Sequence, residues 1–193
     1  EGIGSGLRRI TAVAHEKAHE LFQEQSRLIA RLAEKAGAAE TELEERFASL
    51  LDERKALKEQ AEGLALVAAL GKADMLLKEG VSVGGVFVVT GIFEGMAQDI
   101  LRQVGDHIRQ KKSPVVTCLA SVSESNVTFT VMADKPAIEA GVHAGKLAAS
   151  AAKALGGGGG GRPDIASAGA KNPDGLEDAM KKVPEFVGEQ IGK

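Results

Sequence analysis

The 193-residue sequence has no Trp, no Tyr and a single Cys, and its only aromatic side chains are six Phe. The scarcity of aromatics argues against a base-stacking platform of the kind that single-strand-binding proteins use. One cysteine excludes disulfide scaffolds and cysteine-rich zinc modules. The sequence has no run of about 18 apolar residues, so it predicts no membrane-spanning helix. A net charge of -3, from 24 basic and 27 acidic side chains, argues against a uniformly basic protein that coats nucleic acid.

The chain begins at Glu1, without an initiator Met or a signal-peptide pattern. We therefore expect a piece of a longer intracellular protein, cytoplasmic by default, with an organellar copy left open. Residues 1–10 are glycine-rich and then basic. They predict the tail of a preceding domain or a hinge.

Residues 11–64 carry a heptad pattern on two segments, separated by Gly37, which is suited to the left-handed conformation that ends a helix. The pattern predicts two antiparallel helices that fold on each other as a coiled-coil-like hairpin. A rigid spacer is favoured over a dimer zipper as its role. The seam positions are Ala14, Ala18, Leu21, Gln25, Leu28 and Leu32, and then Leu43, Phe47, Leu50, Arg54, Leu57 and Ala61.

Residues 65–193 alternate predicted strands and helices, which indicates a compact α/β domain after the helices. The fold class of the whole chain is therefore α+β or α/β. The predicted elements are a helical or mixed segment 64–79, a strand ending near Thr90, a helix 96–112, strands 115–122 and 126–132, a helix 138–155, and a final helix 176–191 interrupted near Pro184.

Two features that suggest chemistry are interpreted as structural. His15, Glu16 and His19 fit the H-E-x-x-H zinc pattern, but His107 and His143 stand at no recognisable third-ligand spacing. We expect neither a metal site nor a catalytic centre. Cys118 lies in an apolar strand, where a free cysteine usually serves packing.

Six consecutive glycines precede Arg162, Pro163 and Asp164. Such a run costs backbone entropy, so it favours a tight bend or a close approach to the backbone. We interpret residues 156–161 as an anion-binding loop rather than a linker, with a short helix 165–168 just beyond it. The absence of G-K-[ST] after the glycines excludes a nucleoside-triphosphate P-loop.

The stretch 156–180 resembles the glycine-rich signature of the DHH-associated domain at the C-terminus of alanyl-tRNA synthetases, the C-Ala domain. Two flanks agree: residues 6–10 look like the end of the family's editing domain, and residues 101–121 resemble a helix-then-strand segment of the family. Ala170 replaces the usual last glycine. The matching positions are Gly158 to Gly160, Arg162, Pro163, Asp164, Ala166, Ala168 and Gly169.

The resemblance implies that the parent protein is an alanine–tRNA ligase whose catalytic and zinc-containing editing domains lie upstream. The parent would use ATP, Mg and the editing-domain Zn, whereas this part would hold no cofactor. It would dock the outer corner of tRNA, where the D and T loops meet, and couple aminoacylation with editing. Its partners would be tRNA, most simply alanine tRNA, and the catalytic and editing domains of the same chain. Some family members also dimerise through this domain.

The expected RNA-binding surface combines the glycine run with basic side chains, because folded RNA is recognised largely through its backbone and shape. Two alternatives stay open: a dimerisation module, and the substrate-binding domain of a DHH-type phosphoesterase. The predicted RNA-binding residues are Gly156, Gly157, Gly158, Gly159, Gly160, Gly161, Arg162, Lys153, Lys146, Lys171, Arg109, Lys111 and Lys112.

Overall fold

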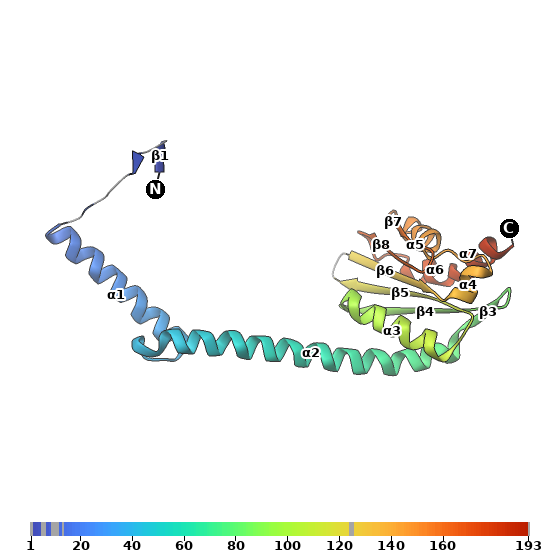
Figure 1. Ribbon diagram of the computed structural model, residues 1–193, viewed down its shortest axis with the longest axis horizontal. Coiled ribbons are helices and arrows are strands. Elements are labelled where there is room, and N and C mark those ends of the chain that lie inside the picture. Colours follow the sequence, from blue (N-terminus) through green and yellow to red (C-terminus); the bar gives the residue numbers. More distant parts are fainter. Residues whose placement is uncertain (1, 5–6, 9–11, 13, 124–125, 193) are drawn as a thin grey trace. The chain divides into compact units, whose positions relative to one another are not determined.

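The computed structural model describes residues 2–4, 7–8, 12, 14–123 and 126–192 (Figure 1). The chain divides into two compact units, residues 1–60 and residues 61–193. The boundary between the units falls inside one long helix. The predicted tail or hinge over residues 1–10 lies partly outside the described residues.

The N-terminal unit contains two very short strands and two helices. α1 ends, as predicted, at Gly37, whose φ of 66° is left-handed and whose N–H donates to the carbonyl oxygen of Glu34. The elements are β1 (Gly2–Gly4), which pairs antiparallel with β2 (Leu7–Arg8), α1 (Glu16–Ala36), the 3-10 turn η1 (Glu40–Glu42) and the first part of α2 (Leu43–Glu79).

The two apolar seams that were predicted to pack on each other are exposed. The exposed fraction is 48% for Leu28, 61% for Phe47 and 65% for Leu57. The helices meet near their joining turn, where Nε of Arg46 donates to the carbonyl oxygen of Ala36 at 3.1 Å. The long N-terminal helices are confirmed, but a closed hairpin over residues 11–64 is not what the described residues form, and α2 continues to Glu79. Heptad spacing shows that each helix has one apolar face, and it does not specify what covers that face.

The C-terminal unit is built on a mixed six-stranded sheet with the order β3-β4-β5-β6-β8-β7. β4 and β5 are parallel, and the other neighbouring strands are antiparallel. The predicted α/β domain is confirmed. The strands are β3 (Val81–Val83), β4 (Val86–Glu94), β5 (Val115–Ser123), β6 (Asn126–Ala133), β7 (Gly158–Gly161) and β8 (Ile165–Ala170).

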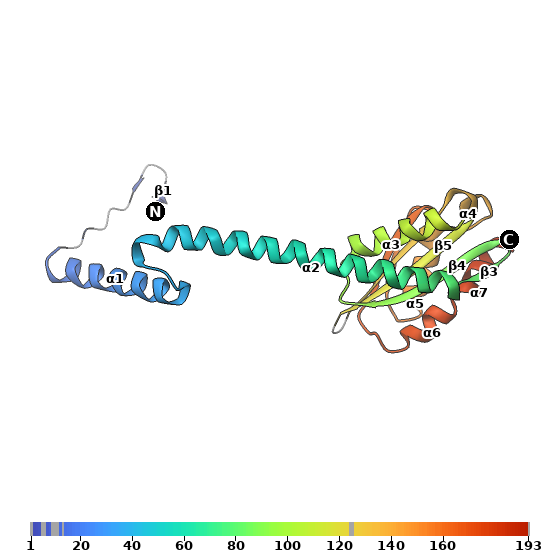
Figure 2. The same ribbon diagram turned by 90° about the horizontal axis from the view of Figure 1, so that it is seen from below.

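Helices cover both faces of this sheet, and each face has its own apolar core (Figures 1 and 2). The end of α2 and α3 (Gln98–Lys111) cover one face, where Leu101 packs in the core that contains Val89. On the other face Leu147 packs in the core that contains Val88. Val88 and Val89 are neighbours on β4, and they enter different cores because side chains alternate along a strand. The helices of that second face are α4 (Lys135–Glu139), α5 (Ala144–Lys153), α6 (Leu176–Lys181) and α7 (Val183–Ile191).

Two local predictions in the C-terminal unit are wrong. The glycine run was predicted to be a loop, but residues 158–161 form the edge strand β7. Residues 165–168 were predicted to be a helix, but they belong to strand β8. The helix predicted over 138–155 is divided into α4 (Lys135–Glu139) and α5, with a turn around Gly141 at a φ of 107°.

No helix in the described part of the chain is long and apolar enough to cross a membrane.

Candidate functional site: a glycine edge strand and its pocket

Alternate glycines of the run are required by packing inside the protein. A Cβ placed on Gly159 would stand 2.3 Å from the Cα of Ala168, and one placed on Gly161 would stand 2.7 Å from the Cα of Ala166. A Cβ on Gly157 would stand 2.1 Å from the carbonyl oxygen of Gly169. Side chains at these three positions would collide with the backbone of β8, so the close pairing of β7 with β8 requires glycine there.

Gly156 has a left-handed φ of 67°, which favours glycine, whereas Gly158 and Gly160 have no such internal reason. A Cβ on Gly158 or Gly160 would meet nothing within 4 Å, and neither residue has a left-handed φ. Both residues are exposed on the sheet edge. Their lack of side chains leaves bare backbone that a ligand can approach closely.

α5 lies against the glycine strand, and the amides at its N-terminus donate hydrogen bonds to the turn between β7 and β8. The N–H of Ala144 donates to the carbonyl oxygen of Pro163 at 3.0 Å, and the N–H of Gly145 donates to that of Arg162 at 3.2 Å. These amides are therefore not directed at an external anion. The N-terminus of a helix at 165–168, which was expected to attract phosphate, does not exist because that segment is a strand.

Arg162 stands on the turn between β7 and β8 and pairs with Asp164. Its Nε and Nη2 donate to the two carboxylate oxygens of Asp164, each at 3.1 Å. The hydrogen bonds from Arg162 hold the pKa of Asp164 below its usual value. The guanidinium charge is thus locally compensated, which lowers its attraction for a polyanion relative to an unpaired cation.

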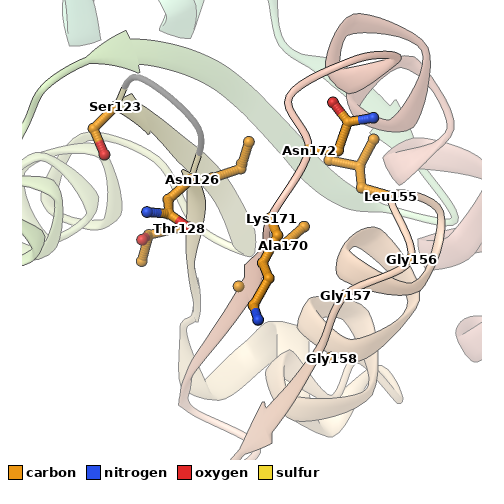
Figure 3. Close-up of a pocket in the computed structure, with 12 residues that line it drawn as sticks. Ser123, Asn126, Thr128, Leu155, Gly156, Gly157, Gly158, Ala170, Lys171 and Asn172 are labelled. Carbon is orange, nitrogen blue, oxygen red and sulfur yellow. The ribbon is translucent and has the colours of Figure 1, made fainter.

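A pocket opens at the end of the sheet where β6 begins and β8 ends (Figure 3). Its volume is about 770 Å³. Three residues from neighbouring strands lie side by side in it, because Thr128 of β6 pairs with Gly169 of β8 and Gly169 pairs with Gly158 of β7. The pocket is lined by Ser123, Asn126, Val127, Thr128, Leu155, Gly156, Gly157, Gly158, Gly169, Ala170, Lys171 and Asn172.

Four of the predicted cations lie on α5 or next to the ends of β7 and β8. Lys171 follows β8 directly and lines the pocket (Figure 3), while Lys146 and Lys153 lie on α5. Lys146 is near the end of α5 that contacts Arg162, and Lys153 is near the end that contacts Gly156. Within the described ranges, the three lysines make no ion pair, so their charges are available to a ligand.

The other three predicted cations lie at α3, on the opposite face of the sheet. Lys111 donates to Asp74 of α2 at 2.7 Å, and together with His107 this hydrogen bond lowers the pKa of Asp74. Arg109 pairs with Asp106, and Lys112 lies 4.8 Å from the centre of the Phe87 ring. The sequence alone left open whether these basic residues converge, and the structure places the cations of α3 and those of α5 over opposite faces of the sheet.

Sequence reasoning missed the polar and apolar side chains of the pocket, namely Asn126, Thr128 and Leu155. They come from segments about 30 residues apart that meet only when β6 pairs with β8. A period-two pattern was available at β8, where alanine at residues 166, 168 and 170 alternates with Ser167 and Gly169, and the structure buries these alanines. That alternation is typical of a strand.

His15, His19 and Cys118 are the residues whose sequence patterns suggested other chemistry. His15, just before α1, and His19, on α1, are both exposed, and His19 lies 2.8 Å from the side chain of Gln23. Among the described residues, no three His, Cys, Asp or Glu side chains gather to hold a metal ion. Cys118 is fully buried, and desolvation raises the pKa of its thiol to about 12.

The comparisons with known proteins agree with the resemblance to the C-Ala domain. The chain is 35% identical over 192 residues to an alanine–tRNA ligase of Alkaliphilus oremlandii, covering 100% of this chain and 22% of that protein. It is 33% identical over 190 residues to the Clostridioides difficile alanine–tRNA ligase, covering 98% of this chain and 22% of that protein. The chain thus spans about a fifth of the length of these curated relatives.

A solved structure and a family model give the same assignment. The C-Ala domain from Aquifex aeolicus alanyl-tRNA synthetase matches with a TM-score of 0.52 and 32% identity, covering 56% of this chain and 97% of that chain. The family model of the DHHA1 domain matches residues 84–189, which is more than half of the chain and includes the glycine strand and its pocket. The chain therefore belongs to the DHHA1 domain family.

Proposed function

We propose that this chain is the tRNA-binding C-terminal domain of an alanine–tRNA ligase. The observation that carries the proposal is the 35% identity to an alanine–tRNA ligase over the whole chain. In this proposal the domain docks the outer corner of tRNA and thereby helps to couple aminoacylation with editing. Its partners are tRNA and the catalytic and editing domains of the same protein. The proposed role places the protein in the cytoplasm.

ATP, Mg and the editing zinc of such a ligase would be held outside this chain. The described residues offer no cluster of metal-binding side chains that fits either metal. The contribution of this chain is therefore binding and orientation of the RNA. A domain that is tethered to the rest of the enzyme raises the effective concentration of the bound tRNA, so weak binding by the isolated domain is compatible with this role.

The proposed RNA surface is the exposed edge of β7 with the lysines beside it. The bare backbone at Gly158 and Gly160 permits close approach, and Lys146, Lys153 and Lys171, which form no ion pair with any described residue, supply positive charge. Phosphate contacts dominate the affinity of such surfaces and make the affinity dependent on salt. The cations of α3 are left out of this surface because they contact Asp106, Asp74 and Phe87.

The test is fluorescence anisotropy with a tRNA transcript and single charge reversals at several salt concentrations. Lys153→Glu is expected to weaken binding by about tenfold and to flatten the salt dependence, since it removes a phosphate contact. Lys112→Glu on the other face is the matched control and should leave the affinity within about twofold. Equal losses from both reversals, or equal binding of a matched-length RNA duplex, would contradict a specific tRNA surface on this side.

A second candidate role, self-association, is favoured by the apolar faces of α1 and α2. Leu21, Leu28 and Leu32 are all exposed on one helix, and Phe47 and Leu57 are exposed on the other. Isolated helices have little stability of their own, so such faces are normally covered by a partner. Sedimentation equilibrium should give a two-chain mass that Leu28→Glu abolishes and Arg27→Glu preserves. A monomer at all concentrations would remove this candidate.

A further inference from the structure

We propose that the pocket at the end of the sheet holds one unstacked nucleotide of the bound RNA, with its ring on the glycine floor and its phosphate at Lys171. This inference rests on the proposed function and names the ligand group that the same region takes. Single-stranded loops are the parts of folded RNA whose bases leave the stack and are read by proteins.

The floor of the pocket suits a planar ring. Gly158 and Gly169 lie side by side across β7 and β8 and have no side chains. A ring can therefore rest directly on the peptide planes without an aromatic platform, which the sequence lacks. Leu155, between α5 and β7, is an apolar residue of the lining.

The rim of the pocket carries the polar groups that a nucleotide requires. Asn126 offers an amide with two donor hydrogens and an acceptor oxygen, and Thr128 offers a hydroxyl. Such groups match the hydrogen-bonding edge of a base or a ribose. Lys171 is the cation among the described lining residues and makes no ion pair within the described chain, so its ammonium group is available to bind a phosphate (Figure 3).

The size and form of the pocket favour one nucleotide. A volume of about 770 Å³ lies within the range of small-ligand sites, which is roughly 300–1,000 Å³. The cavity is open to solvent, so a nucleotide that remains attached to its RNA chain can enter it. With one cation among its described lining residues, the pocket is poorly suited to a highly charged nucleoside triphosphate.

The test combines three variants with two probes. Asn126→Ala removes the side-chain amide, and Thr128→Val replaces the hydroxyl with a methyl group of similar shape. Lys171→Ala removes the charge. Lys135→Ala is the matched control for charge, since Lys135 follows the other end of β6. The probes are a tRNA transcript, followed by anisotropy, and the four ribonucleoside 5′-monophosphates, followed through backbone amide shifts. Thermal unfolding checks that each variant is folded.

The proposal predicts that Asn126→Ala and Thr128→Val weaken tRNA binding about threefold to tenfold without changing its salt dependence. Lys171→Ala should weaken binding and lower the salt slope by about 1. At least one monophosphate should shift the amides of Gly158, Gly169 and Lys171 in a saturable way and compete with tRNA.

Two outcomes separate this inference from the proposed function. If tRNA binds the wild type but the Asn126 and Thr128 variants bind equally well, the pocket inference is overturned and the tRNA role stands. If tRNA does not bind the wild type, the proposed function fails. The monophosphate titration then decides the pocket by itself: saturable shifts at the floor support a nucleotide site, and unchanged amides overturn it.

Discussion

Gly145 of α5 lies so close to Gly161 of β7 that a Cβ on Gly145 would stand 2.3 Å from the carbonyl oxygen of Gly161. Gly145 is buried and sits one residue into the helix, where the chain turns over the glycine strand. The contact is made with backbone atoms, which cannot move aside as the end of a flexible side chain can. The position of α5 against the sheet edge thus depends on the missing side chain at residue 145.

The first prediction concerns this contact. Gly145→Ala should destabilise the protein by about 1–3 kcal/mol, because the added methyl group forces α5 away from β7. Urea unfolding measures the change. Gly71→Ala on α2 is the control, since a Cβ there meets nothing within 4 Å and alanine favours a helix. An unchanged midpoint for Gly145→Ala would show that α5 shifts at no cost.

The second prediction separates the glycines of β7. Gly159→Ala should cost about 1–3 kcal/mol through overlap with Ala168, whereas Gly160→Ala should be neutral or stabilise by up to about 1 kcal/mol. The alanine at residue 160 has open space and restricts only the unfolded chain. Thermal unfolding of both variants checks the difference. Similar losses for the two would mean that the open side of the strand is also packed.

The third prediction concerns pH. The hydrogen bonds from Arg162 lower the pKa of Asp164 from its ordinary value of 3.8, so the pair stabilises the fold above that value. This stabilisation is lost as the pH falls through the lower, folded-state pKa. Carbon-13 NMR of the Asp164 carboxyl should show the depressed titration, and Arg162→Ala should return it towards the ordinary value. The same midpoint in both proteins would exclude the pair as the cause.

The fourth prediction concerns the single thiol. Burial raises the pKa of Cys118 to about 12, so almost no thiolate exists at pH 8. Folded protein should therefore fail to react with a disulfide reagent over minutes, and one equivalent should react at once in denaturant. Rapid reaction of the native protein would place Cys118 at an accessible surface.

The sequence predicted those helices and strands whose apolar side chains recur at a regular spacing. Val-rich segments became β4 and β5, and the spacing of Ile100, Leu101, Val104 and Ile108 gave α3, whose apolar face is buried. A glycine run has no side-chain pattern, so it does not distinguish an edge strand from a loop. Its strand form depends on β8 as a partner and α5 as a cover, and both are tertiary features.

The candidate site was predictable only in part. The glycines and Lys171 were found because their composition and family resemblance stand out in the sequence. Whether Arg109, Lys111 and Lys112 share a surface with them could not be predicted, since the sequence does not say that α3 and α5 lie on opposite faces of the sheet. Asn126 and Thr128 were missed because strand pairing alone brings them to the glycines.

The alternation along the glycine run separates positions where the fold requires glycine from positions where it does not. A combinatorial library randomised at residues 157–161 and sorted only for folding should recover glycine at 157, 159 and 161, where β8 leaves no room. The same sorting should admit small and polar residues at 158 and 160. A second round of sorting for RNA binding should then restrict the residue types at 158 and 160. The two rounds together would separate the residues required for folding from those required for binding.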